Sequence, residues 1–549
     1  MIKSLPRFAT SSADMPSKRT NMKTQIDCHV HKHHKIGTEE RPGSCGIVIF
    51  GASGDLAHRK LYPALFDLYN AGHLPENFFV IGFARSVWDD QAFRNQVLET
   101  LKEIGKPDLA KQKKFVSHLY YRVADLDDTT SFHQLADALK KLDQKYKTQG
   151  NVMYHLAIPP EACGNVVAQL NRAHLINPDK KGGPWTRIIF EKPFGHDLES
   201  ARALNHDIHQ YLKEEQIYRI DHYLGKETVQ NILMFRFANS IFEPIWNRRY
   251  IDNIQIMAHE TLGVEQRAAY YDHAGVIKDM FQNHILQLLA LCTMEPPVRF
   301  NAEQYRDEKT KIFHALRPIP KGQVNDYVVR GQYGPGKIGT KKVIGYRQEE
   351  GVNPRSKTDT FVAMKLFIDN WRWHGVPFYL RSGKRMNAYG TEILIQFKQI
   401  PHSMFLSVPP DTFASNILCF RIQPDEGISL RIESKQPGPE FSLASLNFNF
   451  EYKNVFHTQL MGPYERLLLD CMHGDQTLFI REDQVELSWA FIDRIWQEWQ
   501  KSPAPKFPNY ASGSWGPQAA NKLIEQDGRK WRSYVANYSA PTDEHGKKL

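Results

Sequence analysis

The stretch that decides the fold runs from Ile47 to Leu61 and reads IVIFGASGDLAHRKL. Its first four residues form an unbroken apolar run, which is typical of a strand buried on both faces of a parallel sheet. A glycine turn follows, and apolar residues then recur at helical spacing from Leu61 onward. The order strand, glycine turn, helix indicates a dinucleotide-binding unit, although the usual GxGxxG fingerprint is incomplete.

The turn itself has the chemistry of a phosphate cradle. Gly51 and Gly54 allow the backbone to approach a phosphate without a Cβ in the way. The free N–H groups and the dipole at the start of the next helix attract a pyrophosphate. We therefore expect a dinucleotide to bind at this turn.

Further strands are expected at Phe78–Ala84, Asn151–Pro159 and Arg187–Pro193, with helical stretches between them. Strands that alternate with helices predict a parallel, doubly wound sheet. Residues 45–219 are therefore predicted to form an α/β Rossmann-type dinucleotide-binding domain.

The end of the second expected strand indicates which nucleotide binds. Enzymes that use NAD place an Asp or Glu there to hold the ribose 2′-OH, whereas an Arg suits a 2′-phosphate. Here the sequence IGFARS offers Arg85 and no acid before Asp89. We infer that the nucleotide is NADP; a solvated surface arginine is the alternative.

Past residue 220 the apolar pattern changes to period two. Alternating segments begin at Asn253, Thr360, Thr391 and Ile417, and two more cover residues 428–433 and 446–452. Such alternation predicts strands with one covered and one polar face. Residues 220–535 are therefore predicted to form a larger β+α domain built on a mainly antiparallel sheet, whose broad surface favours a homodimer or homotetramer.

Composition narrows the classes of function. The 549-residue chain has 41% hydrophobic and 24% charged residues, as ordinary globular proteins do, and no apolar run long enough to span a membrane. Its net charge of +9 comes without a basic stripe interleaved with aromatics, so we expect no nucleic-acid partner. The six cysteines form no CxxC pair, which favours reduced thiols and a cytoplasmic protein.

The two ends of the chain are predicted to be tails. Residues 1–44 form a flexible N-terminal extension without an apolar signal core, and a mitochondrial transit peptide is the alternative. Cys28 and the histidines around it could ligate a metal, but no distant Cys/His pair completes a site, so we expect none. Residues 536–549 end in GKKL; because Lys547 is not a small residue, a peroxisome-type pool is only the lesser alternative to the cytoplasm.

The densest chemistry lies in RIDHYLGKE, residues Arg219 to Glu227. His222, Tyr223 and Lys226 could together hold a phosphate, with the lysine supplying charge and the other two directional hydrogen bonds. The alternative is a domain linker with an N-capping aspartate.

A second cluster lies on the expected helix DHAGVIKDMFQNHILQLLALC. Helical spacing places Asp279 on one face with Asn283, and His284 on the apolar face with Ile277, Met280, Phe281 and Leu288. Histidines on apolar faces are more often core residues than catalysts. His284 becomes a candidate base only if a carboxylate orients it, and Asp221 is the carboxylate that we expect to do so.

Six motifs in the same order resemble the glucose-6-phosphate dehydrogenase family. They are GASGDLA, EKPFG (Glu191–Gly195), RIDHYLGKE, FANSIFEPIWNR (Phe237–Arg248), the Asp279–His284 helix and YERLLLDCMHGDQTLF (Tyr464–Phe479). The resemblance runs from about Cys45 to about Tyr534. It implies oxidation of D-glucose 6-phosphate to 6-phospho-D-glucono-1,5-lactone with hydride transfer to NADP+, the first step of the oxidative pentose phosphate pathway.

The resemblance also implies residue roles. His284 would be the general base, Asp221 would orient it, Lys192 would lie between sugar and nicotinamide, and no metal is required. The expected substrate ligands are Lys192, His222, Tyr223, Lys226, Glu260, Asp279, Lys384 and Gln423. The expected cofactor contacts are Gly51, Ser53, Gly54, Asp55, Leu56, Lys60, Arg85, Ala157 and Lys192.

Some positions depart from the family pattern. Animal members carry a second, structural NADP site lined by basic residues, whereas this chain has Trp515, Tyr389, Gly390 and Leu394 at such positions. We therefore predict that the second site is absent or weak. Two alternatives stay open: another NADP-dependent sugar dehydrogenase, against which the phosphate cluster argues, and a non-catalytic NADP-binding sensor, against which Asp221, His284 and Lys192 argue.

Overall fold

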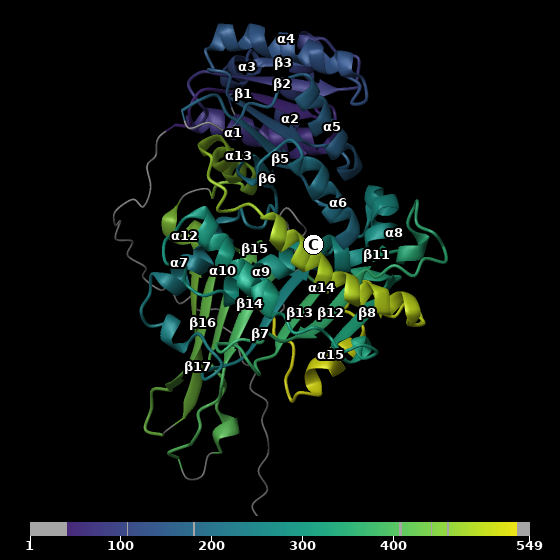
Figure 1. Ribbon diagram of the computed structural model, residues 1–549. Helices are drawn as coiled ribbons and strands as arrows, with labels where there is room; N and C mark the ends of the chain where they lie inside the picture. The colour runs from purple at the N-terminus through teal and green to yellow at the C-terminus, as the bar shows by residue number, and fades with distance from the viewer. Residues whose placement is uncertain are drawn as a thin grey trace, which may run out of the picture.

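The computed structural model describes residues 41–106, 108–178, 182–405, 409–440, 442–457 and 460–534, without the side chains of Gln266 and Asp411. The predicted metal-free histidine cluster around Cys28 and the terminal GKKL lie outside these residues. Two sheets dominate the molecule, one near each end of the view in Figure 1.

The first sheet has six parallel strands in the order β3-β2-β1-β4-β5-β6, the Rossmann order. Its strands are β1 (Cys45–Phe50), β2 (Phe78–Ala84), β3 (Leu119–Val123), β4 (Val152–Leu156), β5 (Thr186–Phe190) and β6 (Ile217–Arg219). The predicted parallel, doubly wound sheet is confirmed. β4 and β5 end before the predicted Pro159 and Pro193, and the freed residues form loops at the carboxyl edge.

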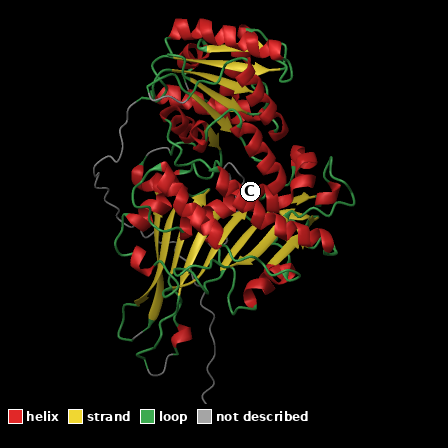
Figure 2. Cartoon of the chain, viewed as in Figure 1, coloured by secondary structure: helices red, strands yellow, loops and turns green. Residues whose placement is uncertain are grey.

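Helices connect the strands of this sheet and pack around it (Figure 2). They are η1 (Ala57–Leu61), α1 (Tyr62–Ala71), α2 (Asp90–Glu103), α3 (Leu109–Val116), α4 (Thr129–Tyr146), α5 (Pro160–Arg172) and α6 (Leu198–His209). Aspartate side chains accept backbone N–H groups at the starts of α2, α3, α4 and α6. The strand order reverses between β1 and β4, and ligands bind in the crevice that such a reversal opens.

The second sheet has eight strands in the order β17-β16-β15-β14-β7-β13-β12-β8. All neighbours are antiparallel except β7 and β13, which confirms a mainly antiparallel sheet. The strands are β7 (Ile251–His259), β8 (Val328–Gly331), β12 (Phe361–Leu366), β13 (Phe378–Gly383), β14 (Gly390–Phe397), β15 (Ile417–Gln423), β16 (Gly427–Lys435) and β17 (Leu443–Glu451).

One side of this sheet carries most of its helices, and α15 lies on the other side (Figure 1). The helices that position the site are α7 (Glu227–Phe237), α8 (Ala268–Val276), η5 (Ile277–Ile285), α9 (Leu286–Thr293), α10 (Ala302–Ala315), α13 (Pro463–His473), α14 (Glu482–Lys501) and α15 (Gln518–Glu525). Within the described ranges, no helix combines the length and apolar character needed to cross a membrane.

The chain returns to the parallel sheet after the second one is complete. α13 packs against α1, and the backbone N–H of Ile480 donates to the carbonyl of Arg219 in β6 at 3.0 Å. Gln476 Nε2 also donates to the carbonyl of Ile217, at 2.9 Å. The returning segment therefore holds the edge strand β6 and the residues that follow it.

The turn after β1 generates a prediction about stability. Gly51 has a φ of +76°, and a Cβ added there would lie 2.2 Å from the carbonyl oxygen of Ala157. Gly51→Ala should lower the free energy of unfolding by about 3 kcal/mol, because a left-handed conformation and a backbone clash add together. Calorimetric unfolding of the variant checks this.

Gly105→Ala is the matched control. Gly105 has a φ of +70° but no heavy atom within 4 Å of an added Cβ, so only the conformational cost of about 1 kcal/mol remains. Equal losses in the two variants would show that the approach of Gly51 to Ala157 does not matter.

Candidate active site

A cavity of about 990 Å³ lies where the carboxyl edge of the parallel sheet meets the second sheet. Most of the predicted site residues line it: Asp55, Leu56, Lys60, Ala157, Lys192, His222, Tyr223, Lys226, Glu260, Asp279, His284 and Gln423. Six others do not reach its wall: Gly51, Ser53, Gly54, Arg85, Asp221 and Lys384. The structure thus brings together side chains from both halves of the chain.

The glycine turn forms one end of the cavity region. The N–H of Gly54 donates to the carbonyl of Gly51 at 2.9 Å, and helical turns begin at Asp55. The N–H of Gly51 donates to the carbonyl of Phe83 at 2.9 Å, which joins the turn to the end of β2. Arg85 follows there, exposed and without a hydrogen bond or ion pair to other described residues. A close backbone turn, a helix start and an unpaired guanidinium fit a dinucleotide with a 2′-phosphate.

Asp221 and His284 form a buried pair. His284 Nδ1 lies 2.5 Å from Asp221 Oδ1, and because a carboxylate only accepts, Nδ1 carries the proton. The N–H of Tyr223 donates to the same oxygen at 2.9 Å and fixes the carboxylate. Nε2 of His284 is then the acceptor, and Lys192 Nζ donates to it at 2.8 Å. The imidazole therefore offers a lone pair on the cavity side.

Burial and charge set the protonation of this pair. Burial lowers the pKa of His284 below its ordinary value; the Asp221 carboxylate opposes this, and the Lys192 ammonium reinforces it. Burial alone would raise the pKa of Asp221, but the imidazole and the Tyr223 N–H together lower it. The pair is thus a carboxylate and a neutral imidazole near neutral pH.

The helix that carries His284 is not a regular α-helix. It bends at Gly275, whose φ is 61°, and continues as a π-helix over Ile277–Ile285. Residues five apart then lie one turn above each other, so Asp279 lies over His284. Lys192 Nζ accordingly contacts Asp279 Oδ1 at 3.4 Å as well as His284. The prediction that Asp279 and His284 occupy different helix faces is wrong, because it assumed the α-helical period.

Asp279 is surrounded by cations. Besides Lys192, Arg267 lies 3.6 Å from its Oδ1. Burial acts to raise the pKa of Asp279, but Lys192 and Arg267 overcome it and lower the pKa strongly. Sequence reasoning missed Arg267, since only the folded chain brings it beside this carboxylate.

The predicted phosphate cluster lies at the start of α7. Lys226 Nζ donates to Gln423 Oε1 at 2.6 Å, and Gln423 Nε2 donates to Thr391 Oγ1 at 3.2 Å. Tyr223 OH lies 3.2 Å from the same hydroxyl. Burial lowers the pKa of Lys226 to about 8, against the Glu426 carboxylate. His222 is held neutral, because burial and the nearby ammonium groups of Lys192 and Lys226 lower its pKa far below the ordinary value.

Glu260 and Lys384 form a second charged pair. Lys384 Nζ donates to Glu260 Oε2 at 2.6 Å. Glu260 lines the cavity, whereas Lys384 lies behind it, 5.0 Å from the ring centroid of Tyr271. The structure therefore places Lys384 as a support for Glu260.

Sequence reasoning also missed a chain of polar groups that runs from the buried His155 to Glu191 and Tyr464 at the cavity wall. His155 Nε2 lies 2.9 Å from Glu191 Oε1, and Tyr464 OH donates to Glu191 Oε2 at 3.3 Å. Tyr464 also stacks on His222, with ring centroids 6.4 Å apart. The signal was present in the motif EKPFG, whose glutamate precedes the lysine.

Two groups of described residues have the spacing of a metal site: Asp221, His222 and His284, and separately His209, Glu214 and Glu482. In the first group His284 Nδ1 already donates to Asp221. In the second, Arg219 NH1 contacts Glu214 at 2.6 Å. The absence of a metal therefore stays a prediction.

Comparison with known families decides what the chain is. Residues 48–231 match the glucose-6-phosphate dehydrogenase NAD binding domain, and residues 233–532 match the glucose-6-phosphate dehydrogenase C-terminal domain. The chain belongs to the glucose-6-phosphate dehydrogenase family. The matches account for both sheets described above.

Individual members of the family are similar over nearly their whole length. Glucose-6-phosphate 1-dehydrogenase of Aggregatibacter actinomycetemcomitans is 47% identical over 491 residues, 89% of this chain and 97% of the relative. The enzyme of Bacillus subtilis is 44% identical over 496 residues, 90% and 99% of the two chains.

A solved glucose-6-phosphate dehydrogenase in complex with its substrate glucose-6-phosphate superimposes with a TM-score of 0.81. It is 35% identical, and the match covers 91% of this chain and 100% of that one.

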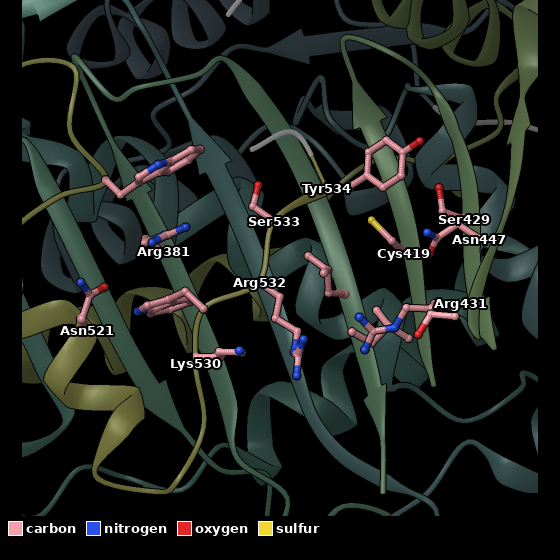
Figure 3. Close-up of a pocket in the computed structure, with 15 residues that line it drawn as sticks. Arg381, Cys419, Ser429, Arg431, Asn447, Asn521, Lys530, Arg532, Ser533 and Tyr534 are labelled. Atoms are coloured by element: carbon pink, nitrogen blue, oxygen red, sulfur yellow. The ribbon is translucent and has the colours of Figure 1, made fainter. Parts of the chain in front are cut away.

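A second cavity, of about 650 Å³, lies on the far side of the eight-stranded sheet (Figure 3). Basic side chains line it together with two tryptophans: Arg381, Arg431, Lys530, Arg532, Trp515 and Trp531. The Arg381 guanidinium lies 5.5 Å from the Trp515 ring and 4.5 Å from the Trp531 ring. Leu394 also lines this cavity, whereas Tyr389 lines the first one.

This cavity bears on the second NADP site of animal glucose-6-phosphate dehydrogenases, which is predicted to be absent or weak here. Trp515, which the resemblance aligns with an arginine of animal members, lies beside Arg381 and carries no charge. We expect purified protein to retain no NADP at the second cavity, and at saturation to bind one NADP per subunit. Isothermal titration after gel filtration measures the stoichiometry. Two NADP per subunit, one surviving gel filtration, would overturn the prediction.

Proposed function

We propose that the chain oxidises D-glucose 6-phosphate at C1 to 6-phospho-D-glucono-1,5-lactone with NADP+ as hydride acceptor, and that His284 is the general base. The observation that carries the assignment of the base is the 2.5 Å contact between His284 Nδ1 and Asp221. It leaves the lone pair of Nε2 facing a cavity. The residues that line this cavity include those expected to bind the phosphate and the hydroxyl groups of the substrate. The names of the relatives and the substrate complex of one of them support the reaction.

His284 performs the proton transfer. Its neutral imidazole takes the C1 hydroxyl proton on Nε2, and Asp221 stabilises the imidazolium that forms. Lys192, which donates to Nε2 at 2.8 Å, yields this lone pair to the substrate hydroxyl and keeps its contact with Asp279. NADP+ bound at the glycine turn supplies the acceptor for the hydride. General-base catalysis of this kind contributes about 10²- to 10⁴-fold.

The phosphate end of the substrate is held by the cluster at the start of α7. Lys226 supplies the charge, and its hydrogen bond to Gln423 fixes the ammonium group. Tyr223 and the neutral His222 add directional hydrogen bonds. The pKa of Lys226, about 8, means that this charge weakens in alkaline solution unless the phosphate stabilises it.

Acidic side chains hold the sugar hydroxyls. Glu260 is fixed by Lys384, and Asp279 by Lys192 and Arg267. A carboxylate oxygen in either position accepts hydrogen bonds from hydroxyl groups. A pocket built in this way rejects substrates that leave its buried polar groups unpaired.

The surface of the large sheet and the cysteines indicate how the protein assembles and where it resides. A homodimer or homotetramer forms through the large sheet, supported by the exposed apolar side chains of β17, Leu443, Leu446 and Phe448. A cytoplasmic setting is supported by the described cysteines, all of which are free and buried.

Substrate and cofactor preference can be measured directly. NADPH formation should require glucose 6-phosphate, with free glucose and NAD+ giving much lower kcat/KM. Arg85→Ala should lower kcat/KM for NADP+ about 10- to 100-fold and leave that for NAD+ nearly unchanged, because it removes a charge-assisted contact to the 2′-phosphate. No turnover of glucose 6-phosphate would end the proposal.

The base is tested by His284→Asn, which should lower kcat about 10²- to 10⁴-fold with intact NADP+ binding. His273→Asn is the matched control, because His273 is exposed one helix earlier. A near-normal rate for His284→Asn would show that another group takes the proton.

A further inference from the structure

A lysine with no role in the proposed mechanism lies buried in α10. Lys309 is in the middle of α10 and is 0% exposed. Its Nζ has no hydrogen-bond partner among the described residues, and the ring centroid of Tyr305 is 5.4 Å away. A buried ammonium without a partner is costly, so something in its surroundings must offset the cost.

The packing of α10 places Lys309 toward the loop that carries Asp221. One turn earlier, Arg306 NH2 donates to Gln476 Oε1 at 3.2 Å, and Gln476 in turn donates to the carbonyl of Ile217 in β6. Residues three apart share a helix face, so Lys309 also faces β6 and the residues after it. Asp221 is the second residue after β6.

Buried acceptors without partners occur on the elements around Lys309. Asp221 Oδ1 is fully used by His284 and Tyr223, but Oδ2 has no partner among the described residues. Gln484 Nε2 donates to the carbonyl of Arg306, which places the side chain beside this turn of α10, and its Oε1 is unpaired. An ammonium group has three donors, and the missing partners of Lys309 and Asp221 are complementary.

We propose that Lys309 is a positioning residue for the base: its ammonium group reaches Asp221 Oδ2 through one buried water and holds the carboxylate and its charge behind His284. The inference rests on the proposed function, since it takes His284 as the base. His284 and the N–H of Tyr223 would then fix Oδ1 of Asp221, and Lys309 would fix Oδ2.

The charges around Lys309 agree with this placement. Burial lowers the pKa of Lys309 to about 7, and Asp221 is the carboxylate that most opposes this effect. The other charged groups acting on it are Arg306 on its own helix and Asp483 and Arg481 at the start of α14. On the other side of the pair, Lys192 and Asp279 act on His284.

The charge of Lys309 changes the pKa of His284. A cation behind Asp221 opposes protonation of His284 and keeps Asp221 ionised. Removing it raises the pKa of the base, so the acid limb of the pH profile of kcat/KM moves to higher pH, by about one unit.

The test uses the full chain with Lys309→Met, Lys309→Arg and the control Lys311→Met. Lys311 lies on the same helix, but its side chain is 66% exposed and pairs with Glu308. Rates with glucose 6-phosphate and NADP+ are measured from about pH 5 to pH 10. Lys309→Met should move the acid limb up by about one unit, while Lys309→Arg and Lys311→Met stay near the wild-type position.

A structural role would have a different signature. If Lys309 only supported the fold, Lys309→Met would lower the melting temperature and leave the acid limb in place, whereas under the proposal the limb moves whatever happens to the melting temperature. A folded Lys309→Met variant with an unmoved limb overturns the proposal. Should this variant not fold, Lys309→Gln, which keeps hydrogen bonding without charge, must show the same shift, and an unmoved limb there overturns it equally.

Failure of the proposed function looks different again. If His284→Asn kept the wild-type rate and acid limb, the base would be another group, whatever Lys309 does. In an Asp221→Asn background, Lys309→Met should cause no further shift of the residual activity, because the carboxylate through which it acts is gone. A shift as large as in the wild type would place the action of Lys309 elsewhere.

Discussion

The contact of Asp221 with His284 joins the two halves of the molecule at the proposed site of proton transfer, beside the contacts that Lys192 makes to His284 and Asp279. Asp221 follows the last strand of the parallel sheet, whereas His284 belongs to a helix that covers the eight-stranded sheet. Both side chains are buried, so each offsets the desolvation of the other. The relative placement of the two sheets is therefore fixed at the proposed base.

The strand β6, which precedes Asp221, is held in place by later segments of the chain. β6 has three residues and lies at the edge of its sheet. Hydrogen bonds from Gln476 and Ile480, far later in the chain, hold its carbonyls, and Glu214 pairs with the buried Arg219 at 2.6 Å. The position of Asp221 thus depends on hydrogen bonds from the last quarter of the sequence.

Local patterns in the sequence predict what local physics decides. The apolar run before Gly51 and the period-two strands identified both sheets, and the need of a buried base for a carboxylate paired His284 with Asp221. β13 was missed, because this fully buried strand contains Arg381 and Ser382 and shows neither an apolar run nor alternation. Arg267, Tyr464 and Lys309 were missed because their partners lie far away in the chain, and no spacing in the sequence records such contacts.

The π-helix between Asp279 and His284 makes the site sensitive to chain length as well as to side-chain chemistry. Five residues make the turn that places both groups against Lys192. Loss of any one residue in that turn would rotate everything beyond it by about 100° around the helix axis. The imidazole would then turn away from its carboxylate, although every functional residue remained present. A deletion or insertion in this segment is therefore more damaging than a substitution at one of its other positions.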